Sequence, residues 1–229
     1  MLSPVIPFGI KGAIWYQGES NANEHEEYKS LLPLMIKSWR NSWNLGDFPF
    51  GIVQLSSFYP TSENPAEGGW AFLRSAQLIT SEKVKNTGLI VTTDIGDAND
   101  IHPKNKQDVG IRLAKWALAD AYKKKIIYSG PIAQKIRRQG SNIIIDFKFT
   151  GNGLQKKNNE KLGLFGITDE TGIWKTANAS IKGSSIILNS SFIKKPTQAC
   201  YAWSNNPEKS NLINSEGLPA SCFWLKVDN

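Results

Sequence analysis

The chain contains two histidines, and one of them, His102, occupies a position suited to acid–base chemistry. It follows the strand-like segment 88–93, and three aspartates precede it closely, Asp94, Asp97 and Asp100. Loops that leave the carboxyl ends of parallel strands are where α/β sheets place their sites. A histidine beside a carboxylate can take a proton from a serine and then protonate the leaving group. The alternative is a structural histidine that caps the next helix.

The second histidine, His25, lies in the acidic segment Asn23-Glu24-His25-Glu26-Glu27. Acidic side chains are favoured in the first turn of a helix, so this segment predicts a helix start. We therefore expect a solvated imidazole on the surface of that helix, without a catalytic role.

A second polar block, Gln17-Gly18-Glu19-Ser20-Asn21, directly follows the apolar run 12–16. Gly18 permits a tight turn at the end of this predicted strand. The side-chain amide of Gln17 can donate a hydrogen bond to a developing oxyanion. The block is therefore a candidate for the lining of an active site.

Ser20 in this block has two interpretations. Gly18-Glu19-Ser20 superficially suggests a nucleophile elbow, but the second glycine of that motif is absent because position 22 is alanine. Ser20 is equally suited to cap the following helix, with Asn21 and Asn23 as rivals for that role. We favour the cap or turn role over the nucleophile.

Strand and helix patterns alternate in the first part of the chain. The apolar segments 12–16, 49–55 and 88–93 predict buried strands. Helical spacing is present at Tyr28, Leu31, Leu32, Met35, Ile36 and Trp39, in segment 70–80 with Leu73, Gln77 and Ile79, and at Val109, Leu113, Trp116 and Ala117. Pro33 should kink the first helix or mark its first turn. This alternation predicts a parallel sheet with both faces covered.

The pattern changes after about residue 125. Short strand patterns at 143–149, 164–167, 179–181, 185–188 and 199–203 are separated by Gly, Asn and Pro turns. Such spacing is typical of a small antiparallel β-sandwich. We expect an α/β domain over residues 1–127 and a β-sandwich domain over residues 128–229.

Several blocks, in order along the chain, resemble the sialate O-acetylesterase family. They are Trp15 to Asn21, Trp39-Arg40, Phe48-Pro49-Phe50 with Gln54-Leu55, Trp70 with Leu73-Arg74 and Gln77, Asn99 to Gln107 with Val109-Gly110 and Arg112-Leu113, Tyr201 to Pro207, and Asn214 to Pro219. The resemblance implies an SGNH-type hydrolase with a flavodoxin-like α/β core. It also implies removal of O-acetyl groups from sialic acids or related glycans by a serine and a histidine, with neither metal nor cofactor.

The resemblance assigns the catalytic histidine to His102 and places Gln17, with Glu19 and Ser20, at the substrate or oxyanion side of the site. The family's serine lies in a Gly-Gln-Ser-Asn-Met type block, which has no match here, so we expect the nucleophile upstream of this chain. The chain alone should then be inactive. Many SGNH hydrolases have an aspartate three residues before the histidine, where this chain has Asn99. Asp100 or Asp97 therefore becomes the candidate orienting carboxylate.

Composition is that of an ordinary globular protein, with 40% hydrophobic and 21% charged residues and a net charge of +7. The basic residues concentrate between positions 123 and 161, but no nucleic-acid motif accompanies them, so a solvated lysine surface is expected. No apolar run reaches the ~18 residues of a membrane span. The first residues lack the pattern of a signal peptide. The resemblance nevertheless implies a periplasmic or secreted complete protein, with the missing N-terminal half as a partner.

Two further features leave alternatives open. Cys200 and Cys222 could form one disulfide in an exported protein, or remain as two buried thiols. The eight tryptophans would suit sugar stacking, which makes a non-catalytic carbohydrate-binding or structural remnant the alternative function. Tryptophans of small sandwiches more often belong to the core.

Overall fold

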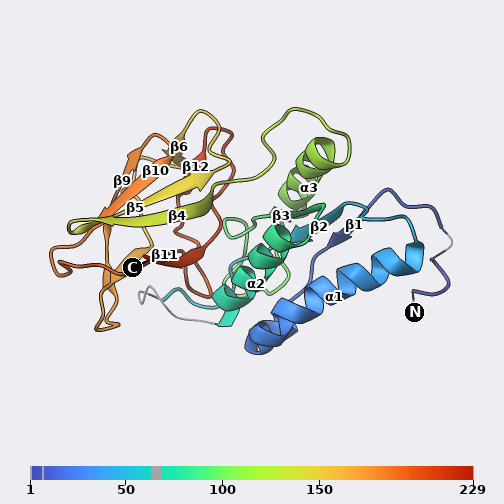
Figure 1. Ribbon diagram of the computed structural model, residues 1–229, viewed down its shortest axis with the longest axis horizontal. Coiled ribbons are helices and arrows are strands. Elements are labelled where there is room, and N and C mark those ends of the chain that lie inside the picture. Colours follow the sequence, from blue (N-terminus) through green and yellow to red (C-terminus); the bar gives the residue numbers. More distant parts are fainter. Residues whose placement is uncertain (1, 7, 63–68, 229) are drawn as a thin grey trace.

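The chain folds into an α/β part and a β-rich part that lie beside each other (Figure 1). The computed structural model describes residues 2–6, 8–62 and 69–228. The α/β part comes first in the chain, and the β-rich part begins with the strand that starts at Ile132. A small parallel sheet and antiparallel sheets therefore coexist in one mixed fold. The boundary between residues 127 and 128 stays a prediction.

The parallel sheet has three strands in the order β1-β2-β3. They are β1 (Ala13–Trp15), β2 (Phe50–Val53) and β3 (Thr87–Ile90). Both pairings are parallel, as the alternating pattern predicts. Because the strands run the same way, the segments that follow them emerge at one edge of the sheet.

Helices cover both faces of this sheet (Figure 1). They are the 3₁₀-helix η1 (Glu19–Glu24), α1 (His25–Trp43), α2 (Gly69–Lys83) and α3 (Lys106–Asp120). Buried side chains of α1 and α2 share one apolar core with β2 and β3. Trp116 of α3 packs on the opposite face, where Gly51 and Gly88 leave room for its ring. Helix α1 continues through Pro33, so the first-turn alternative is wrong.

The β-rich part contains two four-stranded antiparallel sheets and a small two-stranded one, with orders β4-β5-β10-β9, β13-β11-β7-β8 and β12-β6. Its strands are β4 (Ile132–Gln139), β5 (Asn142–Lys148), β6 (Leu154–Lys156), β7 (Phe165–Thr168), β8 (Lys175–Thr176), β9 (Asn178–Lys182), β10 (Ser185–Asn189), β11 (Gln198–Tyr201), β12 (Leu212–Asn214) and β13 (Phe223–Lys226). Apolar side chains of both larger sheets, including Ile145 and Ile167, form one shared core.

A fully buried arginine joins the two parts. The guanidinium of Arg74, on α2, donates hydrogen bonds to the carbonyl oxygens of Leu55 (2.8 Å) and Ser56 (2.8 Å), directly after β2. It also donates to the carbonyls of Ser204 (2.7 Å) and Asn205 (2.7 Å), after β11. Burial lowers the pKa of Arg74 to about 10, which leaves it charged at neutral pH. One cation thus fixes two segments that are far apart in the sequence.

Neighbouring side chains strengthen this interface. The amide of Gln54 donates to the hydroxyl of Ser221 (3.0 Å), and the main-chain nitrogen of Trp70 donates to the side chain of Asn205 (3.2 Å). The amide of Asn206 donates to the carbonyl of Tyr59 (2.7 Å). The β-rich part therefore supports the segment that follows β2.

Both cysteines are buried thiols that do not form a disulfide, so the second of the two alternatives left open by the sequence holds. Burial raises the pKa of Cys200 to about 12 and that of Cys222 to about 11, so both thiols stay protonated at neutral pH. Within the described residues, no helix is long and apolar enough to cross a membrane.

We predict that Arg74→Ala destabilises the protein strongly, because four carbonyls each lose a charged donor, and those of Leu55 and Ser204 have no other donor among the described residues. The free energy of unfolding should fall by about 3 kcal/mol or more. Urea unfolding followed by tryptophan fluorescence measures it. Arg138→Ala, at an exposed position of β4, is the matched control and should change stability by less than about 0.5 kcal/mol. Equal, small effects of the two substitutions would contradict the role of Arg74.

Candidate functional site

Three polar side chains, one after each parallel strand, form a single hydrogen-bond network. The Tyr16 hydroxyl lies 2.8 Å from Ser56 Oγ, which lies 3.0 Å from Thr92 Oγ1. Thr92 Oγ1 donates its own proton to the carbonyl of Gln54 (2.6 Å). Ser56 must then donate to Thr92, and Tyr16 must donate to Ser56. Burial is the main cause that raises the pKa of Tyr16, so its proton stays committed to this network.

The side chain of Gln17 is held from both of its ends. Its Nε2 donates to Asn21 Oδ1 (2.7 Å), and its Oε1 accepts from the Tyr28 hydroxyl (3.1 Å). The carbonyl of Gln17 accepts from Gln77 Nε2 (3.1 Å). Among the described residues, the second N–H of the Gln17 amide has no acceptor, so it is available to a ligand.

Gly18 makes the turn that directs the chain from β1 into η1. Its φ of +146° lies in a region that side-chain-bearing residues rarely adopt. An added Cβ would lie 2.5 Å from Leu73 Cδ2, in the core between the sheet and α2. The position therefore requires glycine for both its backbone conformation and its packing.

Glu19 and Ser20 begin η1, with Glu19 partly exposed and Ser20 exposed. Of the cap or turn role predicted for Ser20, the cap is wrong, and the residue lies in the 3₁₀ turn of η1. Helix η1 leads directly into α1, whose N-cap residue is Glu24, and neither helix has a side-chain cap hydrogen bond. The side chain of Asn21, a rival cap, instead accepts from Gln17. The cause is the 3₁₀ turn, in which the main-chain N–H of Asn21 donates to the carbonyl of Gly18 (2.9 Å).

His102 lies on the loop between β3 and α3 with its side chain 87% exposed. Its Nδ1 lies 3.7 Å from Asp100 Oδ1, and the same oxygen accepts the main-chain N–H of His102 (2.9 Å). The following Pro103 is buried and anchors the loop. The imidazole therefore has a carboxylate beside Nδ1, and Nε2 is open to solvent.

The other two aspartates that precede His102 have different partners. Asp94 forms a bidentate ion pair with Arg112 of α3, with N–O distances of 2.7 and 2.8 Å. Asp97 accepts the main-chain N–H of Asn99 (2.9 Å) within its own turn. Of the three carboxylates, only that of Asp100 lies within 4 Å of the His102 imidazole nitrogens. The geometry thus favours Asp100 over Asp97 as the orienting group.

The loop that carries His102 packs against the ends of the other strands. A Cβ on Gly96 would lie 2.2 Å from the carbonyl oxygen of Ser57, which shows how closely this loop approaches the segment after β2. Lys106 Nζ lies 4.9 Å from the centroid of the Tyr16 ring, after β1. The Gln17 block and the His102 loop therefore share one edge of the sheet, although no hydrogen bond joins Gln17 to His102.

His25 does not have the solvated side chain predicted for it. Its ring stacks on Phe72 of α2, with centroids 4.7 Å apart and an interplanar angle of 16°. Only 22% of the side chain is exposed. The packing of α1 against α2 causes this burial, and it gives His25 a structural role.

Sequence reasoning gave no site role to several residues that build the site, chiefly Ser56, Thr92, Arg74 and Gln77. Two of them could have been recognised from the sequence. Arg74 and Gln77 are polar, yet they lie at helical spacing with the apolar Trp70 and Leu73 on the face of α2 that is buried. Among the described residues, no three His, Cys, Asp or Glu side chains come together as a metal site.

We predict that Gly18→Ala destabilises the protein by about 1–3 kcal/mol, through backbone strain and the clash with Leu73. Thermal unfolding followed by circular dichroism measures it. Gly110→Ala is the control, because Gly110 is exposed in α3 and has open space around its Cβ position. That substitution should be neutral or stabilising by up to about 1 kcal/mol. Unchanged stability of Gly18→Ala would contradict the requirement for glycine.

Solved structures and known sequences contain clear relatives of this chain. A crystal structure of a carbohydrate acetylesterase from Xanthomonas citri superposes with a TM-score of 0.93 at 36% sequence identity, covering 99% of this chain and 52% of that one. The rat sialate O-acetylesterase is 30% identical over 99% of this chain, and the human one is 30% identical over 97%. This chain spans only 46% and 47% of their respective lengths, about half of each.

The mixed α/β fold is thus close to that of a carbohydrate acetylesterase, as the resemblance implied. A family profile described as "Carbohydrate esterase, sialic acid-specific acetylesterase" matches residues 4–119, which include Gln17 and His102. The chain therefore belongs to the sialic acid-specific acetylesterase family of carbohydrate esterases.

Proposed function

We propose that this chain forms part of an esterase that removes O-acetyl groups from sialic acids or related acetylated glycans. Family membership supports the reaction class, and the names of its relatives support the acetylated sugar as substrate. The observation that carries the proposal is His102, whose imidazole has Asp100 beside Nδ1 and an open Nε2 at the carboxyl edge of a parallel sheet.

In the proposed reaction, Nε2 of His102 accepts the proton of a serine hydroxyl while the serine oxygen attacks the acetyl carbonyl carbon. The imidazolium then protonates the sugar oxygen as the ester bond breaks. Water, deprotonated by the same imidazole, releases acetate from the acetyl-serine. Asp100, whose Oδ1 lies 3.7 Å from Nδ1, stabilises the imidazolium by its charge.

Gln17 is the proposed contact to the acyl oxygen. Its amide is held by Asn21 and Tyr28, so its remaining N–H is presented to a ligand without a further loss of side-chain freedom. Glu19 and Ser20 lie beside it on η1 and are proposed to contact the sugar.

We further propose that the serine comes from an upstream segment, which completes a flavodoxin-like SGNH core on the free edge of β1. In the described residues β1 pairs with β2 alone, and its Ile14 is 65% exposed. A shallow groove of about 180 Å³ runs there between β1 and Trp116 of α3. Relatives about twice as long have the additional residues for this role. The same segment would cover His102, which here is exposed.

We predict that His102→Ala, in the protein extended to include the upstream segment, lowers kcat for an acetyl ester by about 10³-fold or more. KM should change little, because proton transfer acts in the transition state. Steady-state hydrolysis of an O-acetylated sialic acid measures both constants. Asp100→Ala should lower kcat more than Asp97→Ala, since only Asp100 lies near the imidazole.

His25→Ala is the control, because His25 is the other histidine and packs on Phe72, away from solvent. This variant should keep its turnover, even with some loss of stability. Near-normal turnover by His102→Ala together with a loss in His25→Ala would overturn the assignment.

A further inference from the structure

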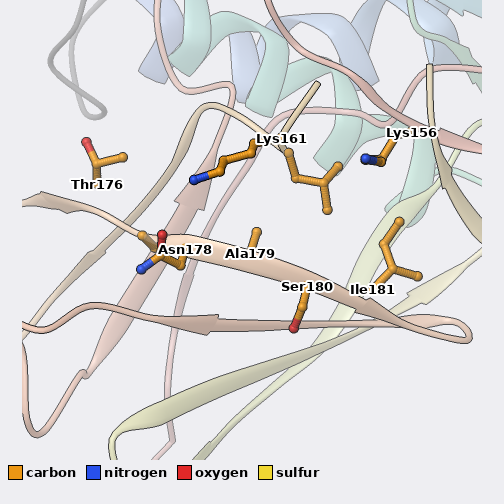
Figure 2. A pocket seen from close by; sticks show the side chains of 9 residues that line it. Lys156, Lys161, Thr176, Asn178, Ala179, Ser180 and Ile181 are labelled. Atoms are coloured by element: carbon orange, nitrogen blue, oxygen red, sulfur yellow. The ribbon is translucent and has the colours of Figure 1, made fainter. Parts of the chain in front are cut away.

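The β-rich part carries a groove that the ester site does not use. It has a volume of about 520 Å³ and is lined by Lys156, Lys161, Leu162, Thr176, Ala177, Asn178, Ala179, Ser180 and Ile181 (Figure 2). None of these residues belongs to the α/β part that holds Gln17 and His102. The groove is therefore a separate feature of the molecular surface.

The groove follows the edge of a strand. Four consecutive residues of β9, from Asn178 to Ile181, line it. Side chains of a strand point alternately to its two faces, so a lining by consecutive residues places the groove along the strand edge. In the sheet order, β9 is a terminal strand and pairs with β10 alone among the described strands. Backbone donors and acceptors at this edge are available to a ligand.

The charge of the groove is positive and uncompensated. Lys156 and Lys161 have no carboxylate within 4 Å in the described residues, whereas nearby Lys148 pairs with Glu82 at 2.7 Å. No acidic residue lines the groove. Figure 2 shows the two lysine side chains toward different ends of the β9 segment, with Lys161 near Asn178. A ligand that lies along β9 would thus meet a cation at each end.

Apolar and polar groups alternate between these cations. Leu162 and Ala177 are buried and offer an apolar floor, while Thr176, Asn178 and Ser180 are exposed and offer hydroxyl and amide groups. Sugars present apolar C–H faces and many hydroxyls, so a saccharide fits such a mixture better than a purely apolar ligand does. The lysines add a preference for a carboxylate.

We propose that this groove binds an acidic saccharide, with its carboxylate at Lys156 or Lys161, as a second sugar site apart from the ester site. The choice of a sialic acid as that saccharide rests on the proposed function. A glycan long enough to span both sites would be held at a raised effective concentration without a tighter ester site.

The test measures binding of the methyl glycoside of N-acetylneuraminic acid to this 229-residue chain by protein-observed NMR titration. The methyl ester of the same sugar keeps the ring but removes the charge, and it should bind about fivefold more weakly or worse. The double substitution Lys156→Gln, Lys161→Gln should weaken binding of the free acid about tenfold. Lys182→Gln, on the same strand but outside the groove, is the matched control and should leave binding unchanged.

Equal binding of the acid and its ester, or equal binding by the double variant and Lys182→Gln, would overturn the proposal. So would concentration-dependent pairing of two chains along β9 that excludes the sugar. Hydrolysis of a small acetyl ester measures the ester site separately. The Lys156→Gln, Lys161→Gln variant of the extended enzyme should hydrolyse it at the normal rate. If His102→Ala loses hydrolysis but still binds the sugar, the groove is a binding site that does not depend on the ester site.

Discussion

A single buried cation holds the site in place. Carbonyl groups that leave a parallel strand lose their ladder partners, and in a dry interior each unpaired carbonyl is costly. Arg74 supplies donors to two such carbonyls after β2 and to two more after β11. Arg74 therefore ties the segment that follows β2 both to α2 and to the segment that follows β11. These hydrogen bonds connect the two parts of the fold beside the carboxyl edge of the parallel sheet.

The carboxyl edge contains a rigid part and an open part. The rigid part contains Tyr16, Ser56 and Thr92, each of which donates its hydroxyl proton to the next acceptor in one hydrogen-bond network. It also contains Gln17, whose side chain is held by Asn21. The open part is the loop of His102, which presents its imidazole to solvent. A pre-organised polar framework beside an accessible base is the arrangement that acyl transfer requires. In the proposed reaction, the nucleophile enters from another segment.

The sequence patterns predicted the α/β part well, because its strands are continuous apolar runs and its helices have clear apolar stripes. The β-rich part was predicted only in part. Strand β4 is mostly exposed and carries charged residues such as Arg137 and Arg138, which hide the period of two. Strands β6 and β12, with three residues each, are too short to show any period.

Prediction of the site failed wherever tertiary packing decided the outcome. His25 reads as a surface residue, and only the approach of Phe72 from α2 buries it. Ser20 reads as a helix cap, but a 3₁₀ turn made by the main chain takes its place. Asp94 precedes His102 closely in the sequence, yet its carboxylate pairs with Arg112 of α3. The roles of His102 and Gln17 stay predictions, which rest on a local signal, because both residues lie on segments that follow buried strands.

The central claim is that this chain supplies the base and the acyl contact, while the nucleophilic serine lies upstream. Covalent trapping with a fluorophosphonate on the protein extended upstream, followed by peptide mass spectrometry, tests it directly. The account predicts an adduct on a serine before residue 1, formed quickly in the parent protein and far more slowly in His102→Ala. An adduct on Ser20, or labelling that does not depend on His102, would contradict it.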